Sequence, residues 1–157
     1  MRDFRKQLLH FLEKENFNKN LQDIHNFPAQ KTINALFAFL SSPDKRIKGN
    51  AIVAMGEIVA KIAETDMDYA RDIMRRFLWS LNEESGWIGW GSAEAMAEIM
   101  ARNDNLAQEY HKFLISYISE GDNFLLFEDL RKEVILGLKR LSQVHPHLVK
   151  EVGHLLK

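Results

Sequence analysis

Hydrophobic residues recur every three or four positions along almost the whole chain, and no stretch alternates between hydrophobic and polar residues. This spacing places apolar side chains on one face of an α-helix. Eight such stripes can be followed; they begin at Phe4, Ile33, Ile47, Ile73, Ala93, Leu106, Leu130 and Leu148. The pattern therefore predicts an all-α protein in which every helix has one face to bury.

Proline and glycine fall between the stripes. We expect Ser42 to cap the helix that follows it, with Pro43 at the first helical position. Gly121 lies in a turn cluster and suits left-handed backbone. Pro146 marks the start of the last helix, because the residue before a proline is disfavoured in helical geometry. These breaks divide the chain into helices of ordinary length.

The chain repeats itself at an interval of about 40 residues. Residues 40–59 match residues 81–100 at an offset of 41, and the pentapeptides Ala54–Ile58 and Ala95–Ile99 differ at one position. A further offset of 42 brings residues 130–141 into the same alignment. A period of this length in a helical chain indicates stacked helix pairs that share a continuous core.

Residues 40–58 also resemble a known family. Their order is a leucine, a Pro-Asp turn, a hydrophobic-basic element at Ile47-Lys48, and then Ala51 and Ala54-Met55-Gly56. This order is similar to a HEAT repeat of the short bacterial, phycobilisome-lyase HEAT-like type. The resemblance implies an α-α superhelix, a HEAT/armadillo-like solenoid. It also implies a scaffold that binds other macromolecules, since enzymes are a minority in the family.

On this basis the chain is predicted to be a single HEAT-like domain spanning residues 1–157. We expect an N-terminal cap at residues 1–27 and a C-terminal helix at residues 147–157. Between them we expect three helix-pair repeats, at residues 28–65, 66–104 and 105–146.

Composition and charge narrow the function. The 157 residues include no cysteine, which excludes thiolate catalysis and thiolate metal sites. Residues 66–104 hold eight acidic and four basic residues, so the middle of the chain is acidic although the net charge is only −1. A basic stripe would have to assemble from Lys45, Arg46, Lys48, Arg131 and Lys132. Nucleic acid is therefore not the expected partner. Apolar runs are too short for a membrane span, and we expect a cytoplasmic protein.

Two acid-before-base pairs recur at the repeat offset. Glu57 precedes Lys61 by four residues, and Glu98 precedes Arg102 by the same interval. On an exposed helix face such pairs add a few tenths of a kcal/mol each, so helix support is the expected role. Glu94 and Glu98 lie one turn apart, a spacing that acid–base chemistry can use, but no further group converges on them.

The turn into the second repeat departs from the pattern of the others. At the position of Lys48 and Arg131 it has Gly89, within a stretch that holds three glycines and two tryptophans. A broken local rule in an otherwise consistent sequence is where function or strain is expected.

Three interpretations of this turn are open. Trp87 and Trp90 fold back over the helix end as a structural plug, or they are exposed anchors for a protein or peptide. Alternatively, glycine N–H groups at the helix start hold a small ligand or anion, which Glu83 and Glu84 would oppose. The candidate interaction surface comprises Glu83, Glu84, Ser85, Trp87, Trp90, Glu94 and Glu98.

Motifs for other chemistry are not found. The sequence has no His-Glu dipeptide, no phosphate-binding Gly-Lys-Ser/Thr loop and no nucleophile elbow. We therefore expect no metal, no cofactor and no catalysis. The predicted function is protein–protein interaction or scaffolding, with another protein or peptide as the partner. The alternative is a small-ligand-binding enzyme, or an enzyme-maturation factor, that uses the Trp/Gly-rich turn.

Overall fold

The computed structural model describes residues 2–157, and within that range it contains helices and connecting segments but no strands. The prediction of an all-α protein is confirmed. The helices are α1 (Arg2–Glu13), η1 (Asn18–Asn26), α2 (Ala29–Phe39), α3 (Lys45–Thr65), α4 (Met67–Ser80), η2 (Glu83–Ser85), α5 (Ser92–Arg102), α6 (Asp104–Ser116), α7 (Glu128–Val144) and η3 (Pro146–Leu155), where η denotes a 3-10 helix.

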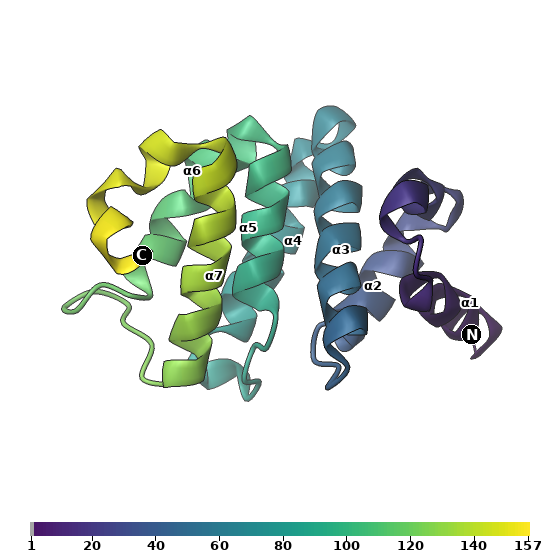
Figure 1. Cartoon of the computed structure of the whole chain (residues 1–157), viewed down its shortest axis with the longest axis horizontal. Coiled ribbons are helices and arrows are strands. Elements are labelled where there is room, and N and C mark those ends of the chain that lie inside the picture. The colour runs from purple at the N-terminus through teal and green to yellow at the C-terminus, as the bar shows by residue number, and fades with distance from the viewer. Residues whose placement is uncertain (1) are drawn as a thin grey trace.

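The helices form two layers. α3, α5 and α7 lie side by side in the layer nearest the viewer, and α2, α4 and α6 lie behind them (Figure 1). α5 is the centre of the front layer, packing against α3 on one side and α7 on the other. α1 and η1 cover the free side of α3, and η3 packs on α6 and α7 at the opposite end. None of the helices between residues 2 and 157 combines the length and apolar character that crossing a membrane requires.

Small residues set the spacing of the front layer. Ala93 and Ala97 of α5 are buried where α7 packs, and Gly137 faces them. A Cβ atom on Gly137 would lie 3.0 Å from the Ala97 Cβ and 3.1 Å from the Ala93 carbonyl oxygen. The two helix backbones can therefore approach closely only because these side chains are small.

The C-terminal segment differs from the expected α-helix. Residues Pro146–Leu155 form a 3-10 helix whose buried side chains are Leu148, Val149 and Val152. Val149 and Val152 are three residues apart, and in a 3-10 helix side chains at this spacing lie directly above one another. The tighter helix thus directs both valines at the core.

The cap of α3 also corrects a sequence-based expectation. Asp44, and not Ser42, is the N-cap: its Oδ1 accepts hydrogen bonds from the backbone N–H groups of Arg46 at 2.9 Å and Ile47 at 3.2 Å. Ser42 Oγ accepts one bond, from the Asp44 N–H at 3.2 Å. Pro43 therefore lies before the cap and outside the helix. The carboxylate caps better because it reaches two otherwise unpaired donors.

We predict that Asp44→Ala lowers the free energy of unfolding by about 1 kcal/mol, because two N–H groups of α3 lose their acceptor. Ser42→Ala should change it much less. Urea denaturation of both variants measures the difference. Equal losses for the two substitutions would contradict the assignment of Asp44 as the cap.

Candidate functional site

The Trp/Gly-rich turn between α4 and α5 has a defined conformation. The Asn82 side chain accepts a hydrogen bond from the Glu84 N–H at 2.8 Å, and Ser85 Oγ accepts one from the Trp87 N–H at 3.0 Å. Gly89 and Gly91 both have positive φ, +81° and +78°. Local hydrogen bonds therefore fix the first half of the turn, and two glycines in the left-handed conformation fix its second half.

The two glycines are required by close approach as well as by φ. A Cβ atom on Gly89 would lie 2.7 Å from the Ser80 carbonyl oxygen, and one on Gly91 would lie 2.8 Å from the Leu40 carbonyl oxygen. Ser80 ends α4, and Leu40 is the C-cap of α2. The turn is thus packed against the ends of two back-layer helices, which holds its backbone in place.

The two tryptophans have different surroundings. Trp87 is 76% exposed, which does not fit a structural plug. Trp90 is partly buried against the core, and its ring meets Phe127 edge-on with 6.0 Å between centroids. Lys48 Nζ lies 6.0 Å from the Trp90 ring centroid. Trp90 therefore joins the turn to the next loop, while Trp87 points away from the core.

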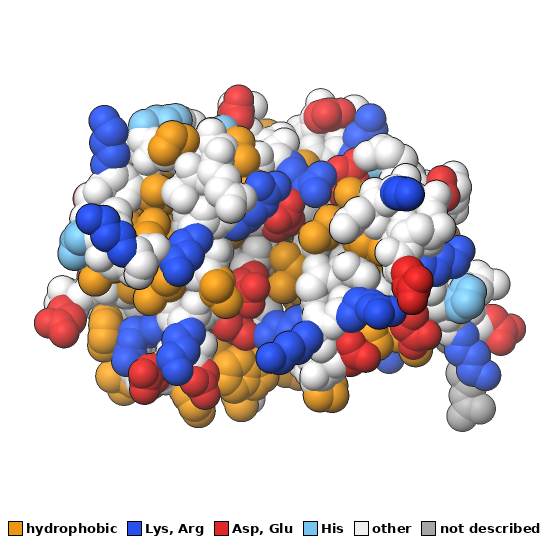
Figure 2. Space-filling view, viewed as in Figure 1, with side chains coloured by type: hydrophobic (Ala, Val, Ile, Leu, Met, Phe, Trp, Pro, Cys, Tyr) orange, Lys and Arg blue, Asp and Glu red, His pale blue; other side chains and the backbone are white. Residues whose placement is uncertain are grey.

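Phe127 belongs to a second exposed group, which the sequence reasoning missed. Leu126 is 80% and Phe127 54% exposed, in the loop directly before α7. With Trp87, Ile88 and Trp90 they form what we call the apolar loop patch. Hydrophobic side chains gather along this lower edge of the molecule, beneath α5 and α7 (Figure 2). The available signal was the apolar run at residues 124–127, immediately before a helix start.

The start of α5 already holds an anionic group. The Gly91 N–H donates to Glu133 Oε1 at 2.8 Å, and the other carboxylate oxygen of Glu133 pairs with Lys48 Nζ. Glu133 is buried and comes from α7. The anion that sequence reasoning placed at these glycines is therefore a side chain of the chain itself. This leaves the small-anion interpretation without the Gly91 donor.

Glu94 lies beside this pair, one helical turn into α5. Its pKa is raised above the ordinary value, first by burial and then by the negative charge of Glu133, while Lys48 acts in the opposite direction. A carboxyl group with a raised pKa favours the protonated form in the folded state. Glu94 is thus less stable as a carboxylate in the folded chain than in the unfolded one.

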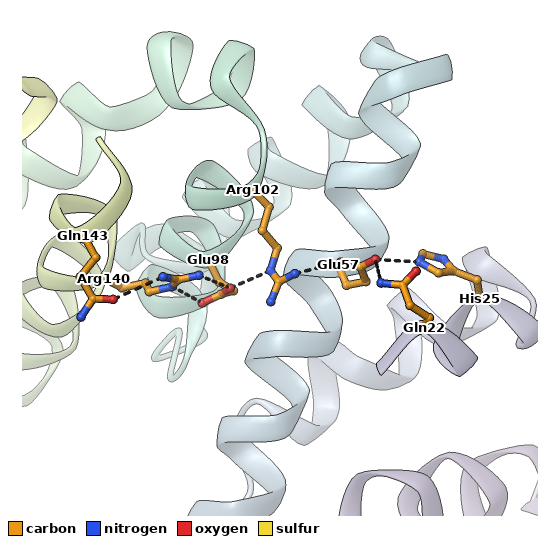
Figure 3. A network of polar contacts seen from close by, with 7 residues as sticks. All are labelled: Gln22, His25, Glu57, Glu98, Arg102, Arg140 and Gln143. Atoms are coloured by element: carbon orange, nitrogen blue, oxygen red, sulfur yellow. Dashed lines mark hydrogen bonds and ion pairs between the residues drawn. The ribbon is translucent and has the colours of Figure 1, made fainter. Parts of the chain in front are cut away.

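Glu98 is the centre of a polar network that crosses the front layer (Figure 3). The residue is 5% exposed. Its carboxylate accepts hydrogen bonds from Arg102 Nε at 2.7 Å, and from Arg140 Nε at 2.9 Å and Nη2 at 3.2 Å. Arg102 belongs to the same helix and Arg140 to α7. Two guanidinium groups therefore neutralise one buried carboxylate from both sides.

The network continues from α5 to α3 and η1. Arg102 Nη1 lies 2.9 Å from Glu57 Oε2, and Glu57 Oε1 accepts a hydrogen bond from Gln22 Nε2 at 2.7 Å and contacts His25 Nε2 at 3.1 Å. At the other end, Arg140 donates to the Gln143 side-chain oxygen at 3.3 Å. We call this connected set, from His25 to Gln143, the charge ladder.

The charge ladder corrects the expected pairing along single helices. Glu57 pairs with Arg102 across the interface instead of with Lys61, which lies 3.7 Å from Glu64. The Glu98–Arg102 pair exists, but it is largely buried and does not lie on an exposed face. Gly56 is the physical reason, because a Cβ atom there would lie 2.5 Å from Glu98 Cγ. Because glycine has no Cβ atom, the Glu98 side chain can enter between α3 and α5.

Two opposing effects act on the acids of the ladder. Burial alone would raise the pKa of Glu98, but hydrogen bonds from Arg140 and Arg102 outweigh it and the pKa lies below the ordinary value. The pKa of Glu57 is lowered in the same way against burial, by hydrogen bonds with His25 and Gln22 and by the charge of Arg102. Both groups are therefore held as carboxylates at neutral pH.

The candidate residues do not form one site. Glu83, Glu84, Ser85 and Trp87 lie in the turn, with Trp90 at its base, while Glu94 faces Glu133 and Glu98 belongs to the charge ladder. Within residues 2–157, no cluster of three or more His, Asp or Glu side chains is suited to hold a metal ion. Comparisons with protein-family models, curated proteins and solved structures find no match to this chain.

We predict that Glu98→Gln destabilises the protein by about 3 kcal/mol at neutral pH, because Arg140 loses its carboxylate partner and Arg102 keeps only Glu57. Since the pKa of Glu98 is lowered in the folded state, its contribution is present above pH 4.5 and is lost as the pH falls through the folded value. Glu109→Gln, which breaks an exposed pair with Arg71, is the matched control and should cost less. Thermal unfolding between pH 2 and pH 7 measures both; an equal loss for the two variants would count against the ladder.

Glu94→Gln should change the stability of the protein in the opposite direction, as an increase at neutral pH. Because its pKa is raised in the folded state, Glu94 lowers the stability of the protein as the pH rises from 4.5 through the folded value. The variant should therefore be more stable than the wild type at neutral pH and equal to it at pH 3. The same unfolding series shows whether the two stabilities diverge in this way as the pH rises, and a variant less stable than the wild type at pH 7 would contradict the prediction.

Proposed function

We propose that this protein is a non-catalytic binding module of the HEAT-like type, which holds a protein partner at the apolar loop patch. The repeat type is supported by where the aligned residues lie in the structure. Residues that the internal alignment makes equivalent, Glu57, Glu98 and Arg140, lie on the three helices of the front layer and are joined by the charge ladder. Translation from one helix pair to the next is the arrangement that such repeats adopt.

The observation that carries the proposal is the exposure of large apolar side chains on a rigid backbone. Trp87, Leu126 and Phe127 are more than half exposed, and they come from two loops joined through the Trp90–Phe127 contact. Exposed apolar patches on folded proteins mark interaction sites, and aromatic residues dominate binding hot spots. Because glycine contacts already hold the turn, binding would order few additional groups and would lose little entropy.

The charges of the front layer disfavour nucleic acid as the partner. Lys48 pairs with buried Glu133, and Arg102 and Arg140 pair with Glu98. Arg131 lies over the Phe124 ring and donates to the Leu125 carbonyl oxygen. Basic side chains already held by internal partners contribute less to phosphate binding, which requires available cations.

We predict that Trp87→Ser lowers the recovery of a bound protein in quantitative affinity capture from the source cells by at least tenfold, because hot-spot tryptophans contribute about 2 kcal/mol or more. Trp79→Ser is the matched control: Trp79 is 53% exposed, but it lies on α4 and outside the patch. Its capture should equal that of the wild type. Both variants should retain the wild-type melting temperature, since neither side chain is in the core.

A second patch variant, Phe127→Ser, should lose the same captured protein as Trp87→Ser. If all three variants recover identical proteins in identical amounts, the patch is not a binding surface and the proposed function fails.

A further inference from the structure

A groove lies beside the apolar loop patch, between the same two loops. It has a volume of about 460 Å³ and is lined by residues of the α4–α5 connection and of the segment that follows α6. Its apolar surface includes Leu81, Phe113 and Phe124. Phe113 is itself an exposed aromatic residue on α6. The groove therefore offers apolar contact area next to the patch.

All the charged residues that line the groove are acidic. Glu83, Glu84 and Asp122 line it and are exposed. Among the side chains that the structure describes, no lysine, arginine or histidine lies within ion-pair distance of these three acids. Most other acids of the central part of the chain are paired. A groove lined by both apolar and polar side chains, with three uncompensated carboxylates, is complementary to an amphipathic ligand that carries positive charge.

We propose that this groove binds a basic amphipathic segment of the protein partner, with its apolar side chains on Phe113 and Phe124 and its lysines or arginines at Glu83, Glu84 and Asp122. The inference rests on the proposed function in one respect, that the partner is a protein. The turn carries Glu83 and Glu84 on the groove and Trp87 in the patch, so one loop contributes to both surfaces. The same charges oppose anionic partners such as nucleic acid or acidic lipid.

The test uses the full chain and two fluorescein-labelled 18-residue peptides with the same helical leucine pattern. One has lysine at every polar position and the other has glutamate. Fluorescence anisotropy should show binding of the lysine peptide, weakening as salt is added, and no binding of the glutamate peptide. Equal binding of the two peptides, or binding of neither, would overturn the inference.

The location of the site is tested by the triple variant Glu83→Gln, Glu84→Gln, Asp122→Asn. It should bind the lysine peptide roughly tenfold more weakly, because each exposed ion pair contributes modestly and three are removed together. The matched control is Glu13→Gln, Glu15→Gln, Asp23→Asn, which changes the net charge equally with exposed residues of the N-terminal segment. The control should bind as tightly as the wild type.

Two results separate this inference from the proposed function. If the lysine peptide binds the groove variant and the control variant equally, the groove is not its site, and the inference fails. If it loses affinity with Trp87→Ser but not with the groove variant, the patch binds protein segments and only the groove assignment is wrong. Failure of the proposed function would appear instead in the capture experiment, which does not depend on the peptide.

Discussion

The buried carboxylate of Glu98 is the constraint on which the front layer depends. A carboxylate with 5% exposure is costly unless it is neutralised, and the groups that neutralise it come from α5 and α7. A shift of either helix along the other would separate Arg140 from Glu98 and leave the buried carboxylate with Arg102 as its one arginine partner. The pair therefore contributes more to the register of the helices than to net stability. Gly56 extends this constraint to α3, because only glycine leaves room for the Glu98 side chain.

A second buried carboxylate lies near the apolar loop patch. Glu133, from α7, ties Lys48 of α3 to the Gly91 N–H at the start of α5, so a second buried carboxylate joins the same three helices near their lower ends. Lys48, Arg102 and Arg140 of the front layer are used in these internal contacts, and most of the apolar side chains of α3 and α5 lie in the core. The loops emerge at this edge, and there Trp87, Leu126 and Phe127 are more than half exposed.

Sequence periodicity predicted the helices because it reports which face of each helix is apolar, and the core residues Ala54, Met55 and Met96 lie where it placed them. It could not predict the charge ladder. Reasoning on residues four apart compares side chains within one helix, whereas Glu57 finds its arginine 45 positions away, on a neighbouring helix. Such a partner depends on the register between helices, which the sequence of either helix alone does not contain. The role of Glu133 at Gly91 was missed for the same reason.

The ladder also gives a reason why the segments matched by the internal alignment differ at one position. The internal alignment places Arg140 in the third repeat where the first two have Glu57 and Glu98. A third glutamate there would repel Glu98; the change of sign lets Arg140 bond Glu98 directly, whereas Glu57 and Glu98 are bridged by Arg102. The ends of the ladder are closed by side chains that carry no fixed charge, Gln22 and His25 on one side and Gln143 on the other. The ladder therefore neutralises its acids with arginines of α5 and α7, and neutral or titratable side chains complete it at both ends.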